Sequence, residues 1–406
     1  MGDVSMDWRG PRLVLAAGIL AGLFQAVFLP RVNPEQLAIA TDVYHHAAAA
    51  ALSGGDPYAV TPPDHPGFRF LYPPVVLAVL LPYGPLGPDL AYAAQTGVNL
   101  LTIGAITVLL VRTVEIGGVD LPRIDRLLVA GFAFGSAGMV TNLVNGQVNP
   151  QLVLGIAGGA VLLERGREAH SGVAFALAAT VKLFPALLGA WLLRARAWRA
   201  IGAAVATGLG GLVLGVLVWG PDLTATYVTV ALPREASTAT FAGGADPTAP
   251  QMTVRRQIAF LAPWLSGSLL FPVAVTVLAP VVLAASRTMA TLRDRLVALQ
   301  ATLLATLSLF SLEPFYLSLA VFPVVPLLYL LEGRWPRRLF FLGALVAFVP
   351  VTLSTVEVWI ETLSTGPGVA ATLRSVARTA FAFALPPTYG VWLMLAGCVA
   401  HQNRSY

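Results

Sequence analysis

Long apolar runs dominate this chain, and short segments that carry most of its arginines separate them. A helix needs roughly 20 apolar residues to cross the hydrocarbon core of a bilayer, and fewer where other helices surround it. Charged residues make up 11% of the chain, whereas a soluble domain carries about 25%. Too few charges are present to cover a globular surface. We therefore predict one all-α, polytopic membrane domain over residues 1–406.

The candidate membrane segments are Leu13–Leu29, Leu90–Val111, Leu127–Leu143, Pro150–Leu163, Gly172–Leu193, Ile201–Trp219, Leu269–Ala285, Leu296–Leu312, Phe315–Leu331, Leu339–Val356 and Ala380–Ala400. Within Gly172–Leu193, Pro185 lacks the N–H that a helix interior needs. We read this segment as two short helices that enter and leave on the cytoplasmic side, which gives about 12 membrane segments. The alternative is one kinked helix, with the opposite topology after it.

The arginines set the expected orientation, because cytoplasmic loops retain Arg and Lys. With the N-terminus inside, most of the 25 basic residues lie on the cytoplasmic side. We predict a multi-pass protein of the plasma membrane with both termini cytoplasmic. The net charge of +5 is spread over short loops rather than gathered on one face, so nucleic acid is not an expected partner. The single cysteine, Cys398, excludes a disulfide framework.

Two external connections are much longer than the others, at Pro30–Asp89 and Gly220–Ser268. Long loops without evident structure are usually functional or disordered, so we expect the chemistry on the extracytoplasmic face. Within the first loop, Tyr72–Pro82 is apolar but too short to span a bilayer. We expect it to lie at the interface or to dip into the membrane.

The first loop contains a carboxylate and two histidines at helical spacing. Asp42, His45 and His46 stand at i, i+3 and i+4, which places them on one face of a helix. One reading is an N-cap at Thr41 or Asp42 with interfacial histidines. A metal site lacks a clear fourth ligand, and we predict none. A third reading makes Asp42 a general base, which requires burial beside a polar substrate.

Two polar turns are further candidates. Ser53–Tyr58, with Asp56 and Tyr58, is a turn by composition, and Tyr72 follows it in a proline-stiffened segment. The pair either covers a site or is plain surface. Asn145, Gln147 and Asn149 lie in the turn Asn145–Asn149 and offer several donors and acceptors. Such residues either bind a substrate or hold helices together.

Four charged positions are unusual for their surroundings. Lys182 is set among apolar residues, and an intramembrane cation is a functional candidate by default, although it could instead snorkel to the interface. Arg255 and Arg256 stand in the second external loop, against the arginine bias. A phosphate contact explains them, and solvated charge is the alternative. Glu313 lies beside Tyr316 at an outer helix junction and is costly there unless paired, for example with one of these arginines.

In chain order, these segments resemble the glycosyltransferase 87 family of the GT-C superfamily, membrane enzymes that use lipid-phosphate sugars. The resemblance covers about Leu13 to Leu331 and rests on Asp42–Ala49, Gly54–Tyr58, Tyr72–Pro74, Asn145–Asn149, Val181–Pro185 and Arg194–Arg199. The family includes polyprenyl-phosphate-mannose-dependent mannosyltransferases. Two places depart from its pattern. Gln251–Thr253 stands where an Asn-Gln-Ser element is common, and Glu313–Tyr316 stands where Trp, Asp and His are common.

The resemblance implies a GT-C-type fold and an inverting transfer of a hexose, expected to be mannose, from a polyprenyl-phosphate donor to a lipid-linked or surface glycan acceptor. It implies Asp42 as the catalytic base, Arg255 or Arg256 on the leaving phosphate, and no cofactor. The expected substrate contacts are His45, His46, Asp56, Tyr58, Tyr72, Asn145, Gln147, Asn149, Lys182, Arg255, Arg256, Glu313 and Tyr316. The alternatives are a lipid-phosphate flippase or transporter without a base, and a subunit without catalysis. No internal repeat is evident, which counts against an inverted-repeat transporter.

Overall fold

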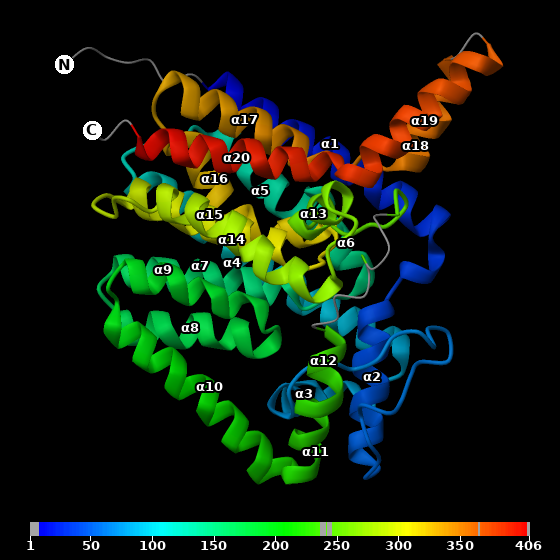
Figure 1. Cartoon of the computed structure of the whole chain (residues 1–406). Coiled ribbons are helices and arrows are strands. Elements are labelled where there is room, and N and C mark those ends of the chain that lie inside the picture. The colour runs from blue at the N-terminus through cyan, green and yellow to red at the C-terminus, as the bar shows by residue number, and fades with distance from the viewer. Residues whose placement is uncertain (1–7, 236–240, 242–245, 364–365, 404–406) are drawn as a thin grey trace.

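The computed structural model of the protein describes residues 8–235, 241, 246–363 and 366–403, apart from the side chains of Arg234 and Glu235. Throughout these ranges the regular secondary structure is helical (Figure 1), and an isolated bridge between Met252 and Leu312 is the one extended pairing there. The predicted all-α class is confirmed.

Four helices are long and apolar enough to cross a membrane by themselves: α1 (Arg9–Val32), α4 (Pro88–Ile116), α10 (Trp198–Trp219) and α14 (Gly267–Ala285). Three bent pairs raise the number to 7 if each pair is one span. These helices confirm a polytopic membrane protein. The prediction of about 12 segments also counts shorter helices, such as α7 (Asn149–Glu164) and α15 (Leu292–Leu309), and their crossing of the bilayer stays a prediction.

Each bent pair breaks where one continuous segment was predicted. Leu127–Leu143 is α5 (Arg123–Gly135) and α6 (Ala137–Asn145), bent by 42° at Ser136. Leu339–Val356 contains the 87° break between α17 (Arg334–Phe348) and α18 (Leu353–Leu363), and Ala380–Ala400 contains the 51° break between α19 (Pro367–Phe383) and α20 (Pro386–Gln402). The physical reasons are a Gly-Ser pair at the first break and prolines at the other two, because proline removes a helix donor and disfavours helix in the residue before it.

The most deeply buried elements are α15 and the segment that follows it, formed by the 3₁₀-helix η6 (Pro314–Ala320) and α16 (Val321–Leu330). By contrast, α10 buries only Ala200 and Gly215 along its length, as expected of a helix that faces lipid. Around the centre, α17 packs closely on α20. A Cβ added to Gly343 or Gly390 would overlap the backbone of the partner helix, and such small residues let membrane helices approach closely.

The predicted break in Gly172–Leu193 is present. Helix α8 (Glu168–Val181) ends before Lys182, and η3 (Phe184–Leu188) and α9 (Gly189–Arg194) follow it. Lys182 has extended backbone angles. The entry and exit of this segment on one side of the membrane stays a prediction.

The two predicted external loops meet at one end of the bundle (Figure 1). Helices α2 (Ile39–Leu52) and α3 (Pro74–Leu80) of the first loop lie there with α12 (Leu232–Glu235) and α13 (Val254–Leu261) of the second. Residues 236–240 and 242–245 of the second loop lie outside the described residues. The first turn of α1 and the last turn of α20 lie at the opposite end. The apolar segment Tyr72–Pro82 forms α3, whose side chains Val76, Leu77 and Leu80 are buried.

Candidate functional site

Asp42 stands in the first turn of α2. Ala38 precedes the helix in a left-handed conformation (φ 60°), and the backbone N–H of Asp42 donates to Ala38 O at 2.9 Å. No described side chain caps this helix, so the N-cap reading of Thr41 or Asp42 is wrong. A carboxylate in a first helical turn is stabilised by the partial positive charge of the helix N-terminus.

The side chain that faces Asp42 is His65, which the sequence analysis did not single out. Its Nε2 lies 3.6 Å from Asp42 Oδ2, and the two side chains are 9% and 14% exposed respectively. The two predicted histidines point elsewhere: His45 Nδ1 lies 2.9 Å from Tyr83 O, and His46 Nδ1 lies 2.9 Å from Asp42 O. Asp42, His45 and His46 therefore lie on one face of the helix, but their side chains do not converge on a common point.

Tyr44 of α2 is linked by hydrogen bonds to two tyrosines of the first loop, Tyr72 and Tyr58. Tyr44 and Tyr72 share a hydrogen bond between their hydroxyls at 3.0 Å, and Tyr44 also donates to Gln147 Oε1 at 3.4 Å. Tyr58 donates to Tyr72 O at 2.7 Å. Burial raises the pKa of Tyr44 and of Tyr58, so both hydroxyls stay neutral. Asp56 is exposed and accepts from the N–H of Tyr58 at 2.8 Å, so it closes the turn.

The Asn145–Asn149 turn is tied to its neighbours on three sides. Gly146 ends α6 with φ 65°, and Thr41 Oγ1 of α2 donates to Gly146 O at 3.1 Å. Asn99 of α4 donates to Gln147 O at 3.1 Å. Asn149 Nδ2 donates to Asn142 Oδ1 at 2.7 Å, which favours the helix-joining reading for Asn149. Among described residues, buried Asn145 Oδ1 has no hydrogen-bond partner.

Lys182 forms a second polar group with Tyr316 and Glu313. Its Nζ donates to Tyr316 OH at 2.6 Å, lies 4.4 Å from the centre of that ring, and the residue is 5% exposed. The ammonium is therefore buried and does not snorkel. Glu313 is exposed at the surface of the structure. The surrounding protein nevertheless removes part of the water from its carboxyl, which raises the pKa of Glu313, and the charge of Lys182 partly counteracts this rise. Among the described residues, Glu313 forms no ion pair with Arg255 or Arg256, and the nearby charge that affects it is that of Lys182.

Arg255 and Arg256 are both buried, so the solvated-charge reading is wrong for each. All five N–H groups of Arg256 donate to backbone carbonyls, namely those of Asp246, Ala249, Gln251, Phe381 and Ala382. These bonds leave it no donor for a substrate. Arg255 Nη2 donates to Ser311 Oγ at 2.6 Å, while its buried Nε has no partner among described residues. Burial lowers the pKa of both groups, yet an arginine stays charged.

Short contacts bring the Asp42 and Lys182 groups to one region. Met252 N donates to Leu312 O at 2.6 Å, so the second loop lies against the residues just before Glu313. Asn142 of α6 donates to Ser318 Oγ of η6 at 2.9 Å, and the next turn of α6 ends at Gly146, beside α2. One turn of α6, about 5.4 Å long, thus connects the contact with α2 to the contact with η6.

An apolar cavity of about 450 Å³ adjoins this region. Its wall includes Leu183 and Pro185 of the broken segment, Pro73 and Val75 of the first loop, and Tyr227 of the second. The remaining lining comes mainly from apolar side chains of α8 and α10. Since α10 faces lipid, this cavity suits an apolar chain that enters from the bilayer.

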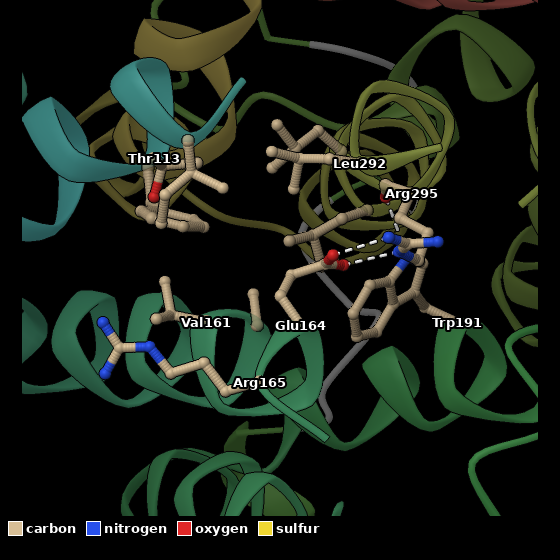
Figure 2. Close-up of a pocket in the computed structure, with 12 residues that line it drawn as sticks. Thr113, Val161, Glu164, Arg165, Trp191, Leu292 and Arg295 are labelled. Atoms are coloured by element: carbon tan, nitrogen blue, oxygen red, sulfur yellow. Dashed lines mark hydrogen bonds and ion pairs between the residues drawn. The ribbon is translucent and has the colours of Figure 1, made fainter. Parts of the chain in front are cut away.

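A smaller cavity of about 90 Å³ lies between the ends of α4, α7 and α15, and its lining is drawn in Figure 2. Arg295 binds Glu164 through two hydrogen bonds, at 2.5 and 2.6 Å, and Trp191 Nε1 donates to Arg295 O at 3.0 Å. The strongest polar groups of this cavity are therefore paired with each other, and Arg165 points away from the pair (Figure 2). We read it as a joint between helices rather than as the site.

A family model described as glycosyltransferase family 87 matches residues 70–312, which is more than half of the chain. The matched range includes the Asn145–Asn149 turn, Lys182, Arg255 and Arg256. It begins after Asp42 and ends before Glu313, so those two positions rest on geometry. A comparison with curated proteins finds no match.

Proposed function

The chain belongs to glycosyltransferase family 87, and from that premise we propose that this membrane glycosyltransferase moves a hexose, expected to be mannose, from a polyprenyl-phosphate donor to a lipid-linked or surface glycan acceptor. The observation that carries the choice of donor is the apolar cavity beside the break at Lys182. In this proposal the cavity takes up the isoprenoid chain, and the phosphate lies near Lys182, the buried residue that precedes the cavity-lining Leu183 in the chain.

The leaving phosphate needs compensating charge as the glycosidic bond breaks. We assign this role to Lys182 and Arg255, because Lys182 is a buried cation next to the cavity wall and the buried Nε of Arg255 has no hydrogen-bond partner among the described residues. Arg256 is excluded from this role by its five carbonyl partners. Arginine can bind a phosphate through two parallel hydrogen bonds, and two cations can supply this charge without a metal.

Asp42 takes the part of general base in this mechanism. Its carboxylate accepts the proton of the acceptor hydroxyl while that oxygen forms a bond to the anomeric carbon. The bond from this carbon to the phosphate oxygen breaks, and polyprenyl phosphate leaves with the electron pair. A single displacement inverts the anomeric configuration. The low exposure of Asp42, 14%, suits a base that acts on a bound hydroxyl rather than on bulk water.

The test is transfer by purified Asp42→Asn protein with polyprenyl-phosphate sugars and candidate acceptors. Asparagine keeps the shape of the side chain but cannot take the proton, so transfer should fall about 100- to 10,000-fold, or about 3 to 5.5 kcal/mol. Donor binding should persist, since Asp42 does not contact the phosphate in this scheme. Wild-type transfer by this variant would remove Asp42 from the mechanism and leave Glu313, a carboxyl with a raised pKa, as the next candidate base.

A lipid-phosphate flippase is the second candidate, because the same cavity and cations suit a moving lipid. Flipping requires no base. A protein that moves labelled lipid phosphate across vesicles equally well with Asp42 or Asn at this position, and that transfers no sugar, would favour this alternative.

A further inference from the structure

We propose that His65 is a positioning residue for Asp42, which fixes one carboxylate oxygen so that the other faces the acceptor hydroxyl. This inference rests on the proposed function of Asp42. The observation behind it is the approach of His65 Nε2 to Asp42 Oδ2 at 3.6 Å between two largely buried side chains. Within the described residues, His65 is the one basic side chain that lies within 4.0 Å of this carboxylate.

The backbone around His65 is fixed independently of Asp42. The N–H of His65 donates to Pro62 O at 3.1 Å, and His65 O accepts from the N–H of Phe68 at 3.0 Å. Pro66 follows at once in the chain, and prolines restrict the backbone on both sides. The neighbouring Asp64 is exposed, whereas His65 is turned inward. The backbone of the loop therefore holds the imidazole of His65 next to Asp42 of α2.

The direction of the imidazole determines its role. With the proton on Nε2, the ring donates toward Oδ2 of Asp42. The present separation of 3.6 Å is longer than a hydrogen bond, so our proposal requires the two side chains to move a few tenths of an ångström closer when the acceptor is bound. One donor on one oxygen restricts rotation of the carboxylate and leaves Oδ1 free. His46 cannot supply this donor, because its Nδ1 lies against the backbone oxygen of Asp42 instead. Orientation of a catalytic group by a neighbouring side chain is a general requirement of acid–base sites.

The experiment compares His65→Ala, His65→Gln and His65→Asn in the full-length protein, with polyprenyl-phosphate mannose and a lipid-linked mannoside as probes. The amide nitrogen of glutamine reaches about as far as Nε2 of histidine, and that of asparagine falls short. We expect kcat to fall about 10- to 100-fold in His65→Ala, the cost of a hydrogen bond to a charged group, with the donor KM unchanged. His65→Gln should recover much of this rate, and His65→Asn should not. A packing role would not separate the two amides in this way.

A double-mutant cycle with Asp42→Asn distinguishes this inference from the proposed function. If His65 acts through Asp42, His65→Ala should cost little further rate once Asp42 is Asn. His170→Ala is the control, because His170 is exposed in the first turn of α8, and it should keep the wild-type rate.

Wild-type kcat in His65→Ala, or an equal loss in both Asp42 backgrounds, would overturn the role of His65 alone. An active Asp42→Asn protein would overturn the proposed base instead. If His65→Ala does not fold, the contrast between Gln and Asn decides the matter, and equal rates for those two variants would refute the inference.

Discussion

Arg255 and Arg256 are consecutive residues with opposite environments. All the N–H groups of Arg256 are used in hydrogen bonds to five backbone carbonyls. Two of these carbonyls belong to the last turn of α19, where the final carbonyls of a helix lack intrahelical partners, so Arg256 links α13 to α19. Among the residues that the structure describes, Arg255 makes one side-chain hydrogen bond, to Ser311, and its buried Nε has no acceptor. A buried guanidinium with an unused donor is costly unless a ligand completes it.

This difference makes the pair its own matched control. Arg255→Ala should raise the donor KM or lower kcat by about 10- to 100-fold, because it removes charge-assisted bonds to the phosphate. Arg255→Lys should rescue only part of this loss, since lysine lacks the planar fork. Arg256→Ala should instead lower the melting temperature, because it removes five hydrogen bonds and leaves the buried carbonyl of Phe381 without this donor, at a cost of about 1 to 3 kcal/mol for that group. Unchanged turnover and donor affinity in Arg255→Ala would remove it from the phosphate site.

For single residues, the sequence was a better guide to which side chains are candidates for the site than to the contacts that these side chains make. Asp42 was singled out by its helical spacing with His45 and His46 and by the family resemblance, and Lys182 because a cation among apolar residues is costly. His65 was missed because it stands among Pro62, Pro63 and Pro66 with no helical period, and only the fold of the loop brings it to α2. The separate roles of Arg255 and Arg256 depend on tertiary carbonyl partners, which sequence spacing does not reveal.

At the scale of whole elements, the turn at the end of α6 contacts α2 and helps to fix its position. Gly146 has φ 65°, a conformation that glycine adopts without cost, and a Cβ at this position would overlap Thr41 Oγ1. The hydrogen bond from Thr41 to Gly146 O sits one residue from Asp42. The position of Asp42 is thus coupled to the backbone of a different segment.

Gly146→Ala tests this coupling. The left-handed conformation costs a residue with a Cβ about 1 to 2 kcal/mol, and the overlap with Thr41 displaces α2. We expect a lower melting temperature and a fall in transfer rate larger than the loss of folded protein explains. The control is Gly158→Ala, since a Cβ at Gly158 of α7 meets open space. Equal activity per folded molecule in the Gly146 and Gly158 variants would show that α2 does not depend on this turn.

Element boundaries were predicted where proline or polarity interrupts an apolar run, and missed where the run continues past a bend. The break at Lys182 followed from Pro185, and the structure has it. The bends near Pro350 and Pro386 lay inside predicted segments because the hydropathy stays high on both sides of them. A hydropathy window averages over such a bend, whereas the backbone cannot continue as one helix through it.

For the whole molecule, the all-α membrane class followed from composition, because so few charges cannot solvate a globule of this size. One hydrophobic cluster extends from Val14 to Cys398, so the membrane helices pack around a shared interior. The orientation rests on the arginine bias alone. The side of the membrane on which Asp42 lies is therefore the property of the whole molecule that most needs a direct measurement.

Impermeant thiol labelling on intact cells supplies this measurement. Cys398 is the single cysteine and is buried, so Cys398→Ala gives a cysteine-free background, which should also label on neither side as a control. We expect Gly67→Cys in the first long loop and Ser268→Cys in the second to react from outside, and Ala169→Cys at the start of α8 to react only after permeabilisation, because arginine-rich connections stay in the cytoplasm.

Labelling of Ala169→Cys from outside would reverse the orientation and move the Asp42 site to the cytoplasm. Labelling of Gly67→Cys but not Ser268→Cys would instead show that residues 172–193 cross the membrane once. The two long loops would then lie on opposite sides, and Arg255 could not share a site with Asp42.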